Sequence, residues 1–165
     1  MSQATAQTKS GDGVRLRAED VEDLAVMAAL LQDARVTLRD MAVDPEEHLF
    51  MAAFVRYRRE LQPDPLDCRG LTERSSVLRL GCIDAVKHKQ LDPADLDREL
   101  SLLTIATAPG ERQLFHIELV FDDGVQIQLR SDCIDALLED FGEPRRCHKT
   151  PCDHFAEEFG LAGSR

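Results

Sequence analysis

The strongest constraint on the fold lies in residues 113–130, where apolar and polar side chains alternate on both sides of a turn. Alternation with a period of two places every second side chain on one face of a strand. Asp122, Asp123 and Gly124 separate the two runs, and these residue types favour a tight turn. The pattern predicts a β-hairpin with one apolar face. Its apolar positions are Phe115, Ile117, Leu119, Phe121, Val125, Ile127 and Leu129.

A helix is predicted directly after this hairpin. Ser131 or Asp132 can cap its first turn, Gly142 follows its last turn, and Pro144 lies just beyond. The apolar residues between these signals recur with a period close to that of an α-helix. They are Cys133, Ile134, Leu137, Leu138 and Phe141.

The rest of the chain predicts one more helix and four more strands. Acidic residues begin an apolar stripe in residues 19–32, as at a helix N-terminus. A short helical turn is expected at residues 92–96, where Asp92 and Pro93 suit a helix start. Runs rich in strand-forming residues predict the strands. These are residues 36–43, 49–59, 76–88, with a bend near Gly81, and 100–107.

The order of these elements favours an α+β fold. Short connections suit antiparallel neighbours, so we expect a six-stranded antiparallel sheet with an N-terminal and a C-terminal helix. The sheet can bend into a small barrel, as in pleckstrin-homology-like folds, or stay open with both helices on one face. The length of 165 residues suits one domain. We place it at residues 14–144, between a disordered arm at 1–13 and a partly ordered tail at 145–165.

The acidic composition limits the classes of partner. The net charge of −11 repels nucleic acid and anionic lipid, so neither a nucleic-acid nor a membrane partner is expected. The first 13 residues lack the apolar core of a signal peptide. We therefore expect a cytoplasmic protein. Its five cysteines form no Cys-x-x-Cys pair and are expected to be reduced thiols.

A weak metal motif lies in the C-terminal tail. Cys147, His148, Cys152 and His154 supply enough ligand types for zinc. The four-residue spacing between the cysteines is wider than in a zinc knuckle, and four ligands so close in sequence rarely reach tetrahedral geometry. We expect a surface tail there, and no cofactor.

The candidate binding residues are Arg56, Tyr57 and Arg58, at the end of the second predicted strand. Side chains two positions apart share a face, so the two guanidinium groups could clamp a carboxylate or phosphate. The plainer interpretation is a solvated strand end paired with the chain's many carboxylates. His116 and Glu118 could form a general-base pair, although alternation already explains them as the solvent face of a strand.

No catalytic or cofactor motif occurs in the sequence. We therefore expect a non-catalytic binding or regulatory module for a protein segment or a small ligand. An exposed sheet edge can recruit an extended peptide or a second copy, which makes a homo-oligomer through a sheet edge possible. The alternative is a small enzyme whose pocket gathers Arg56, His116 and Glu118 for acid–base chemistry.

Several short runs along the chain form a recognisable set. They are residues 16–20, 22–24, 31–34, 40–41, 54–60, 100–103 and 151–154, together with the Gly124 hairpin. This set resembles an uncharacterised family of short bacterial proteins that is known only as a domain of unknown function. The resemblance covers roughly residues 16–154 and implies one domain of this size. It implies no activity, cofactor or catalytic residue.

Overall fold

The computed structural model describes residues 13–64 and 66–153. Within these residues the chain forms ten β-strands, the α-helix α1 and three short 3-10 helices, and residues 151–153 are also α-helical. The strands are β1 (Arg15–Ala18), β2 (Arg35–Thr37), β3 (Met41–Asp44), β4 (Leu49–Tyr57), β5 (Thr72–Leu80), β6 (Ile83–Lys89), β7 (Glu99–Pro109), β8 (Phe115–Phe121), β9 (Gln126–Ser131) and β10 (Ala136–Arg146). The helices are α1 (Val21–Leu30), η1 (Leu38–Asp40), η2 (Arg59–Leu61) and η3 (Asp122–Gly124).

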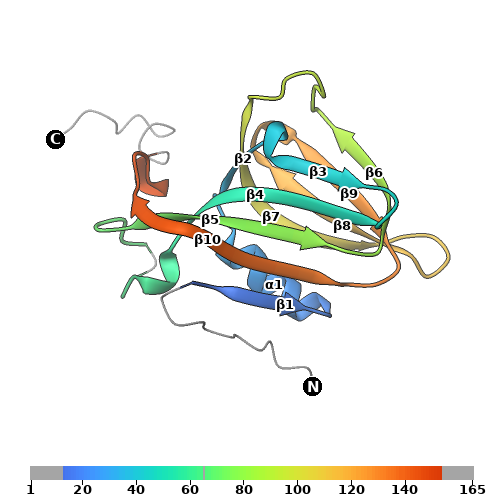
Figure 1. Cartoon of the computed structure of the whole chain (residues 1–165), viewed down its shortest axis with the longest axis horizontal. Helices are drawn as coiled ribbons and strands as arrows, with labels where there is room; N and C mark the ends of the chain where they lie inside the picture. Colours follow the sequence, from blue (N-terminus) through green and yellow to red (C-terminus); the bar gives the residue numbers. More distant parts are fainter. Residues whose placement is uncertain (1–12, 65, 154–165) are drawn as a thin grey trace.

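All ten strands belong to one curled antiparallel sheet (Figure 1). The strand order is β1-β10-β5-β4-β2-β7-β8-β9-β6, and β3 pairs with β4 beside this path. The short strand β2 joins the two halves of the sheet, because it pairs with β4 on one side and with β7 on the other. The sheet does not close. Within the described residues, β3 pairs only with β4 and β6 pairs only with β9.

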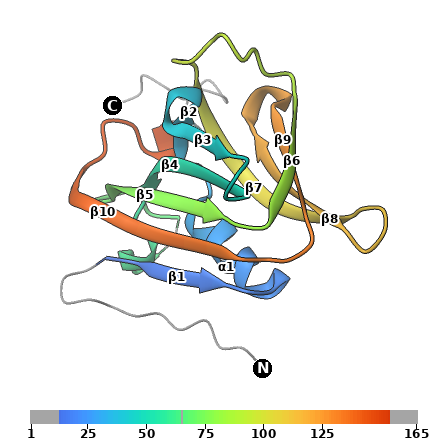
Figure 2. The ribbon, with the colours of Figure 1, turned by 45° about the vertical axis from the view of Figure 1, so that its right-hand side comes forward.

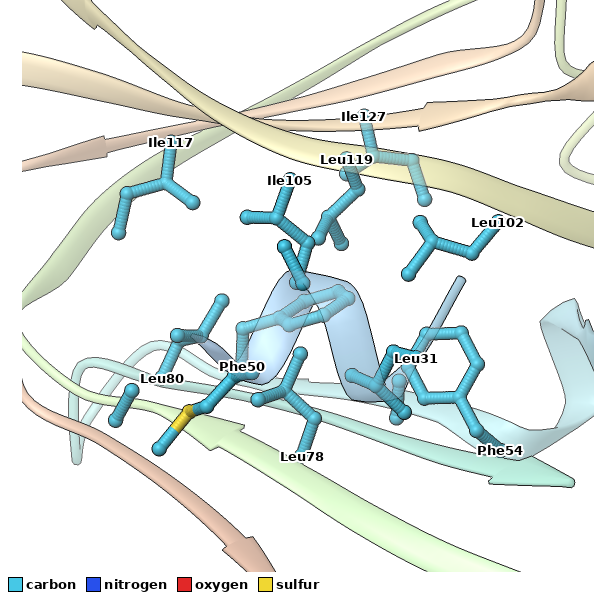
Figure 3. Close-up of a cluster of buried hydrophobic side chains, with 14 of the residues drawn as sticks. Leu31, Phe50, Phe54, Leu78, Leu80, Leu102, Ile105, Ile117, Leu119 and Ile127 are labelled. Carbon is cyan, nitrogen blue, oxygen red and sulfur yellow. The ribbon is translucent and has the colours of Figure 1, made fainter. Parts of the chain in front are cut away.

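The core lies between the two halves of the sheet. Phe50 and Leu78 come from one half, Ile117 and Leu119 come from the other, and all four side chains are buried. Figure 3 shows these side chains pointing toward one another, with Leu31 at the end of α1 among them. Burial of alternate apolar residues on one face of every strand is the dominant stabilising contribution to such a core.

Helix α1 confirms the helix predicted near the N-terminus. The side chain of Asp20 accepts a hydrogen bond from the backbone N–H of Asp23 at 2.8 Å, which caps the first turn. Leu24 and Met27 are buried on the apolar face of the helix. This face packs against β1 and β7, and Figure 2 shows α1 next to β1. The helix thus bridges the two halves of the sheet.

The predicted C-terminal helix is wrong, because residues 136–146 form β10 between β1 and β5. Leu138 is buried in this strand, whereas the adjacent Leu137 lies on the other face. Hydrogen bonds to a strand on each side outweigh the modest helix propensity of this segment. Gly142, with φ of 67°, then permits a bulge before pairing resumes at Arg145.

The predicted strand at residues 76–88 is also wrong, because the chain forms two strands there. β5 ends at Leu80, and β6 begins at Ile83 at the far end of the strand order. Cys82 lies between them with φ of 62°, a left-handed conformation that suits a sharp turn. Residues 92–96 contain turns and no helix.

The observed fold therefore corrects the predicted class. It is a ten-stranded, mainly β structure in which α1 is the longest helix of the described residues, not an α+β fold with six strands and two flanking helices. It is also not a closed pleckstrin-homology-like barrel. The antiparallel pairing is confirmed, and so is the hairpin of β8 and β9. Its turn includes Asp123 and Gly124, both with positive φ.

Two neighbouring leucines test the assignment of β10. Leu138→Ala is expected to lower the free energy of unfolding by about 2–5 kcal/mol, since its side chain fills the core. Leu137→Ala is the matched control and is expected to cost less than half as much, because its side chain is only half-buried. Urea denaturation measures both values. Equal losses of unfolding free energy in the two variants would contradict the assignment of β10 as a strand. A helix with both leucines on its apolar stripe would bury both side chains.

Candidate functional site

The most distinctive surface feature is an apolar groove between β3 and β6, with a volume of about 260 Å³. Figure 2 shows the two strands on the same side of the molecule. β3 contributes Met41, Ala42 and Val43, and β6 contributes Val86 and His88. The floor and one end include further apolar side chains. They are Phe50, Ile127, Leu91, Pro93 and Leu96.

The groove exists because no described strand packs over the core-facing side chains at the free edges of β3 and β6. Val43 lies directly opposite the buried Phe50 in the adjacent strand, so it is on the core-facing side of the sheet. Val86 likewise lies opposite the buried Leu129. Yet Val43 is 49% exposed and Val86 is 37% exposed. One more strand in the gap would bury both valines.

Contacts at both ends keep the two edges in place. At one end the N–H of Ile83 donates a hydrogen bond to the carbonyl of His48 at 2.9 Å. At the other end the N–H of Arg39 donates to the carbonyl of Leu96 at 3.0 Å, and the Arg39 side chain forms an ion pair with Asp97 at 2.8 Å. Between these ends the groove has about the length of a four-residue strand, roughly 13 Å.

The structure places the predicted binding residues inside the protein. Arg56, Tyr57 and Arg58 are all buried, so they do not form an exposed surface at a strand end. Arg56 donates from Nε to Asp140 Oδ1 at 2.8 Å and from Nη2 to Asp140 Oδ2 at 2.6 Å. Its Nη1 and Nη2 also donate to Glu60 at 3.0 and 2.8 Å. The guanidinium of Arg56 is therefore already occupied by two carboxylates.

Burial and ion pairing have opposite effects on the pKa values of Arg56 and Asp140. Burial alone favours the neutral form of Arg56, but hydrogen bonds from its guanidinium to Asp140 and Glu60 raise its pKa above the ordinary value. Burial alone would raise the pKa of Asp140. The Arg56 guanidinium and the backbone N–H of Val14, which donates to Asp140 at 2.9 Å, instead hold that pKa below its ordinary value. Both side chains are charged at neutral pH.

Tyr57 contributes to a second, smaller hollow of about 150 Å³ near the end of β4. Its hydroxyl donates a hydrogen bond to the carbonyl of Lys149 at 3.0 Å. The guanidinium of Arg35 lies 6.0 Å from the centre of the Tyr57 ring and forms an ion pair with the buried Glu73. Arg58 donates to the Thr72 hydroxyl at 3.4 Å. These contacts make the region a packed network of charges.

Two residues of the predicted acid–base site, His116 and Glu118, share one face of β8, and Arg56 lies elsewhere. Glu118, on β8, accepts a hydrogen bond from Gln128 at 3.2 Å. His116 borders a small hollow of about 40 Å³ whose walls include Lys87 and Arg130. Arg56 belongs instead to the buried network at the end of β4. The structure therefore does not gather these three residues around one reaction centre.

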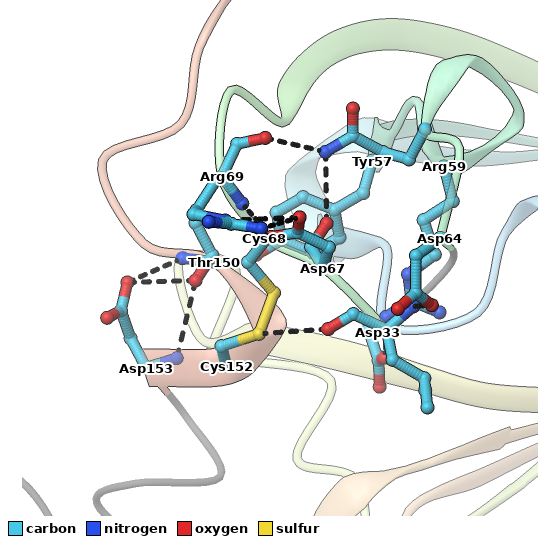
Figure 4. Close-up of a disulfide and its surroundings, with 12 residues drawn as sticks. Asp33, Tyr57, Arg59, Asp64, Asp67, Cys68, Arg69, Thr150, Cys152 and Asp153 are labelled. Carbon is cyan, nitrogen blue, oxygen red and sulfur yellow. Dashed lines mark hydrogen bonds and ion pairs between the residues drawn. A yellow bond between two sulfur atoms is a disulfide. The ribbon is translucent and has the colours of Figure 1, made fainter.

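The prediction of reduced thiols is wrong for four cysteines. Cys68 and Cys152 form one disulfide, shown in Figure 4, and Cys82 and Cys133 form another. Cys152 is therefore not available to the suggested metal site, and His154 lies outside the described residues. Cys147 is a free thiol, and burial raises its pKa to about 11. Among the residues that the structure describes, no group of metal-ligating side chains includes His148.

The sequence did not predict the groove, because no local sequence pattern shows that a strand lies at the edge of a sheet. Residues 36–43 were expected to form one strand, but η1 interrupts them and leaves only four residues in β3. Residues 83–89 were expected to continue β5. The one available signal is the run of Lys87, His88 and Lys89, since charged residues, lysine above all, are frequent on strand edges.

Comparison with known proteins gives a family without a function. Residues 14–153 match the family described as "Protein of unknown function (DUF2948)". The chain belongs to this family. The expected resemblance is thereby confirmed. No curated protein and no solved structure matches the chain. In the part of the chain that is described, the longest helix has ten residues, which is too short to cross a membrane.

The buried ion pair predicts how stability depends on pH. The folded-state pKa of Asp140 is lowered, so its contribution to stability is complete above the unfolded-state pKa of about 3.9 and is lost as the pH falls through the folded-state value. Asp140→Asn removes this contribution and takes one of two carboxylate partners from the buried charge of Arg56. It is expected to lower the free energy of unfolding by about 3–5 kcal/mol at pH 7.

Urea denaturation between pH 7 and pH 3 measures this effect. The difference in unfolding free energy between wild type and Asp140→Asn is expected to shrink toward the acid end of this range. Glu46→Gln, in the exposed turn after β3, is the matched control and should change stability by less than about 0.5 kcal/mol. A difference that stays constant with pH would contradict the assignment of a charged Asp140.

Proposed function

We propose that this protein is a non-catalytic binding module that holds an extended segment of a partner protein in the groove between β3 and β6. One observation carries the proposal: Val43 and Val86 face the core side of the sheet, yet both remain largely exposed. Exposed core-facing side chains on two unpaired edges are the surface that an added strand covers.

The walls of the groove favour a protein segment over a small molecule. They are two strand edges with which no described strand pairs, and the groove between them measures about 260 Å³. It suits one or two apolar side chains that project from a longer chain. The segment's backbone can also pair with the free N–H and C=O groups of an edge strand, which supplies affinity without demanding one particular sequence.

A designed peptide tests the proposal. The peptide has five residues, about the length of the groove, with leucine alternating with serine so that its leucines share one face when it is extended. We expect it to shift the amide NMR signals of β3 and β6 in the labelled full-length protein. Val86→Asp places a charge on the apolar wall and is expected to weaken this binding at least about tenfold.

Two controls separate this result from non-specific adhesion. Val21→Asp makes the same change at another exposed valine, which lies on α1 outside the groove, and should leave binding unchanged. A peptide of the same composition with its leucines clustered should bind more weakly. The proposal is wrong if the alternating peptide causes no shifts at millimolar concentration, or if its shifts lie outside β3, β6 and their neighbours.

A further inference from the structure

The outer face of β6 carries two unpaired positive charges in an acidic protein. Lys87 and Lys89 lie two positions apart on this strand, and both are exposed. The chain has a net charge of −11 and only four lysines. Nevertheless, neither of these two lysines forms an ion pair with another described residue. The β6 edge of the groove is therefore locally basic, whereas the β3 edge ends on the carboxylate of Asp44.

These two lysines point away from the groove. Successive side chains of a strand point to opposite faces, and Val86 lines the groove. The register with β9 agrees, because Val86 lies opposite the buried Leu129 and Lys87 lies opposite the half-exposed Gln128. A strand added beside β6 would thus have one face in the apolar groove and the other in line with the lysines.

We propose that the partner segment alternates apolar residues with acidic ones. This inference rests on the proposed function. The apolar side chains of the segment enter the groove, and the residues between them lie on the outer face, about 4.8 Å from β6. Glutamate or aspartate at these positions pairs with Lys87 and Lys89, and opposite charges on adjacent strands stabilise a sheet.

The same lysines disfavour a second copy of this chain as the occupant. Antiparallel pairing of β6 with β6 would bring Lys87 and Lys89 of both copies onto one face, and like charges directly opposite each other destabilise a sheet. Edge lysines are a common protection against such self-pairing. The homo-oligomer considered from the sequence is therefore disfavoured at this edge, and the partner is a different, acidic segment.

Three matched peptides test the charge preference. Each has five residues in which leucine alternates with glutamate, serine or lysine, and NMR titration of the full-length protein gives each dissociation constant at 50 mM salt. We expect affinity in the order glutamate, serine, lysine, with about tenfold between the first and the last. The difference in affinity between the glutamate and lysine peptides should decrease at 500 mM salt, because salt screens exposed charges.

Charge reversal provides the decisive variant. Lys87→Glu combined with Lys89→Glu is expected to reverse the order of the peptides. Arg15→Glu combined with Arg17→Glu makes the same change in charge on β1, the opposite edge of the sheet, and should preserve the order. If all three peptides bind equally, the proposal of an acidic partner segment is wrong and the groove remains a binding site. If none of the three binds, the proposed function itself fails.

Discussion

The open seam between β3 and β6 is the constraint on which the proposed function of this molecule depends. A curled sheet buries one face of each strand only where the next strand continues the curve, and here the next strand is missing. The side chains of Val43 and Val86 therefore face the core side and remain exposed. Because Ile83 and Arg39 hydrogen-bond across the two ends, the gap is held as a preformed groove. Preorganisation of this kind lowers the entropic cost of binding.

The rest of the structure keeps this seam in place. Asp140 of β10 joins Arg56 of β4 to the backbone of Val14, just before β1, so one buried carboxylate ties three segments together. The Cys82–Cys133 disulfide links the start of β6 to the connection between β9 and β10. Disulfides persist in oxidising compartments and are rare in the cytosol, so the two bridges weigh against the cytoplasmic location expected from the sequence. Arg56, which the sequence suggested as a binding residue, thus stabilises the fold.

The sequence predicted those parts of the fold in which local and tertiary preferences agree. The hairpin of β8 and β9 has both strict alternation and the correct turn residues, and α1 has both a cap and an apolar face. β10 shows the opposite case. Its leucines and cap-like neighbours satisfy a helical pattern equally well, and only its pairing with β1 and β5 decides the outcome. The groove was beyond prediction for a related reason: Val43 and Val86 look like ordinary core residues until the strand order shows that each lies on an edge.

Amide hydrogen exchange, measured by NMR on the free protein, tests the central claim most directly. The amides of β8, which has a partner strand on each side, should be protected along the whole strand. In β3 and β6 the amides that bond to β4 or β9 should be protected, as should that of Ile83, which bonds to His48. The other amides that point into the seam should exchange as fast as those of exposed loops. Protection of both strands along their entire length, equal to that of β8, would show a closed barrel and would contradict the open groove.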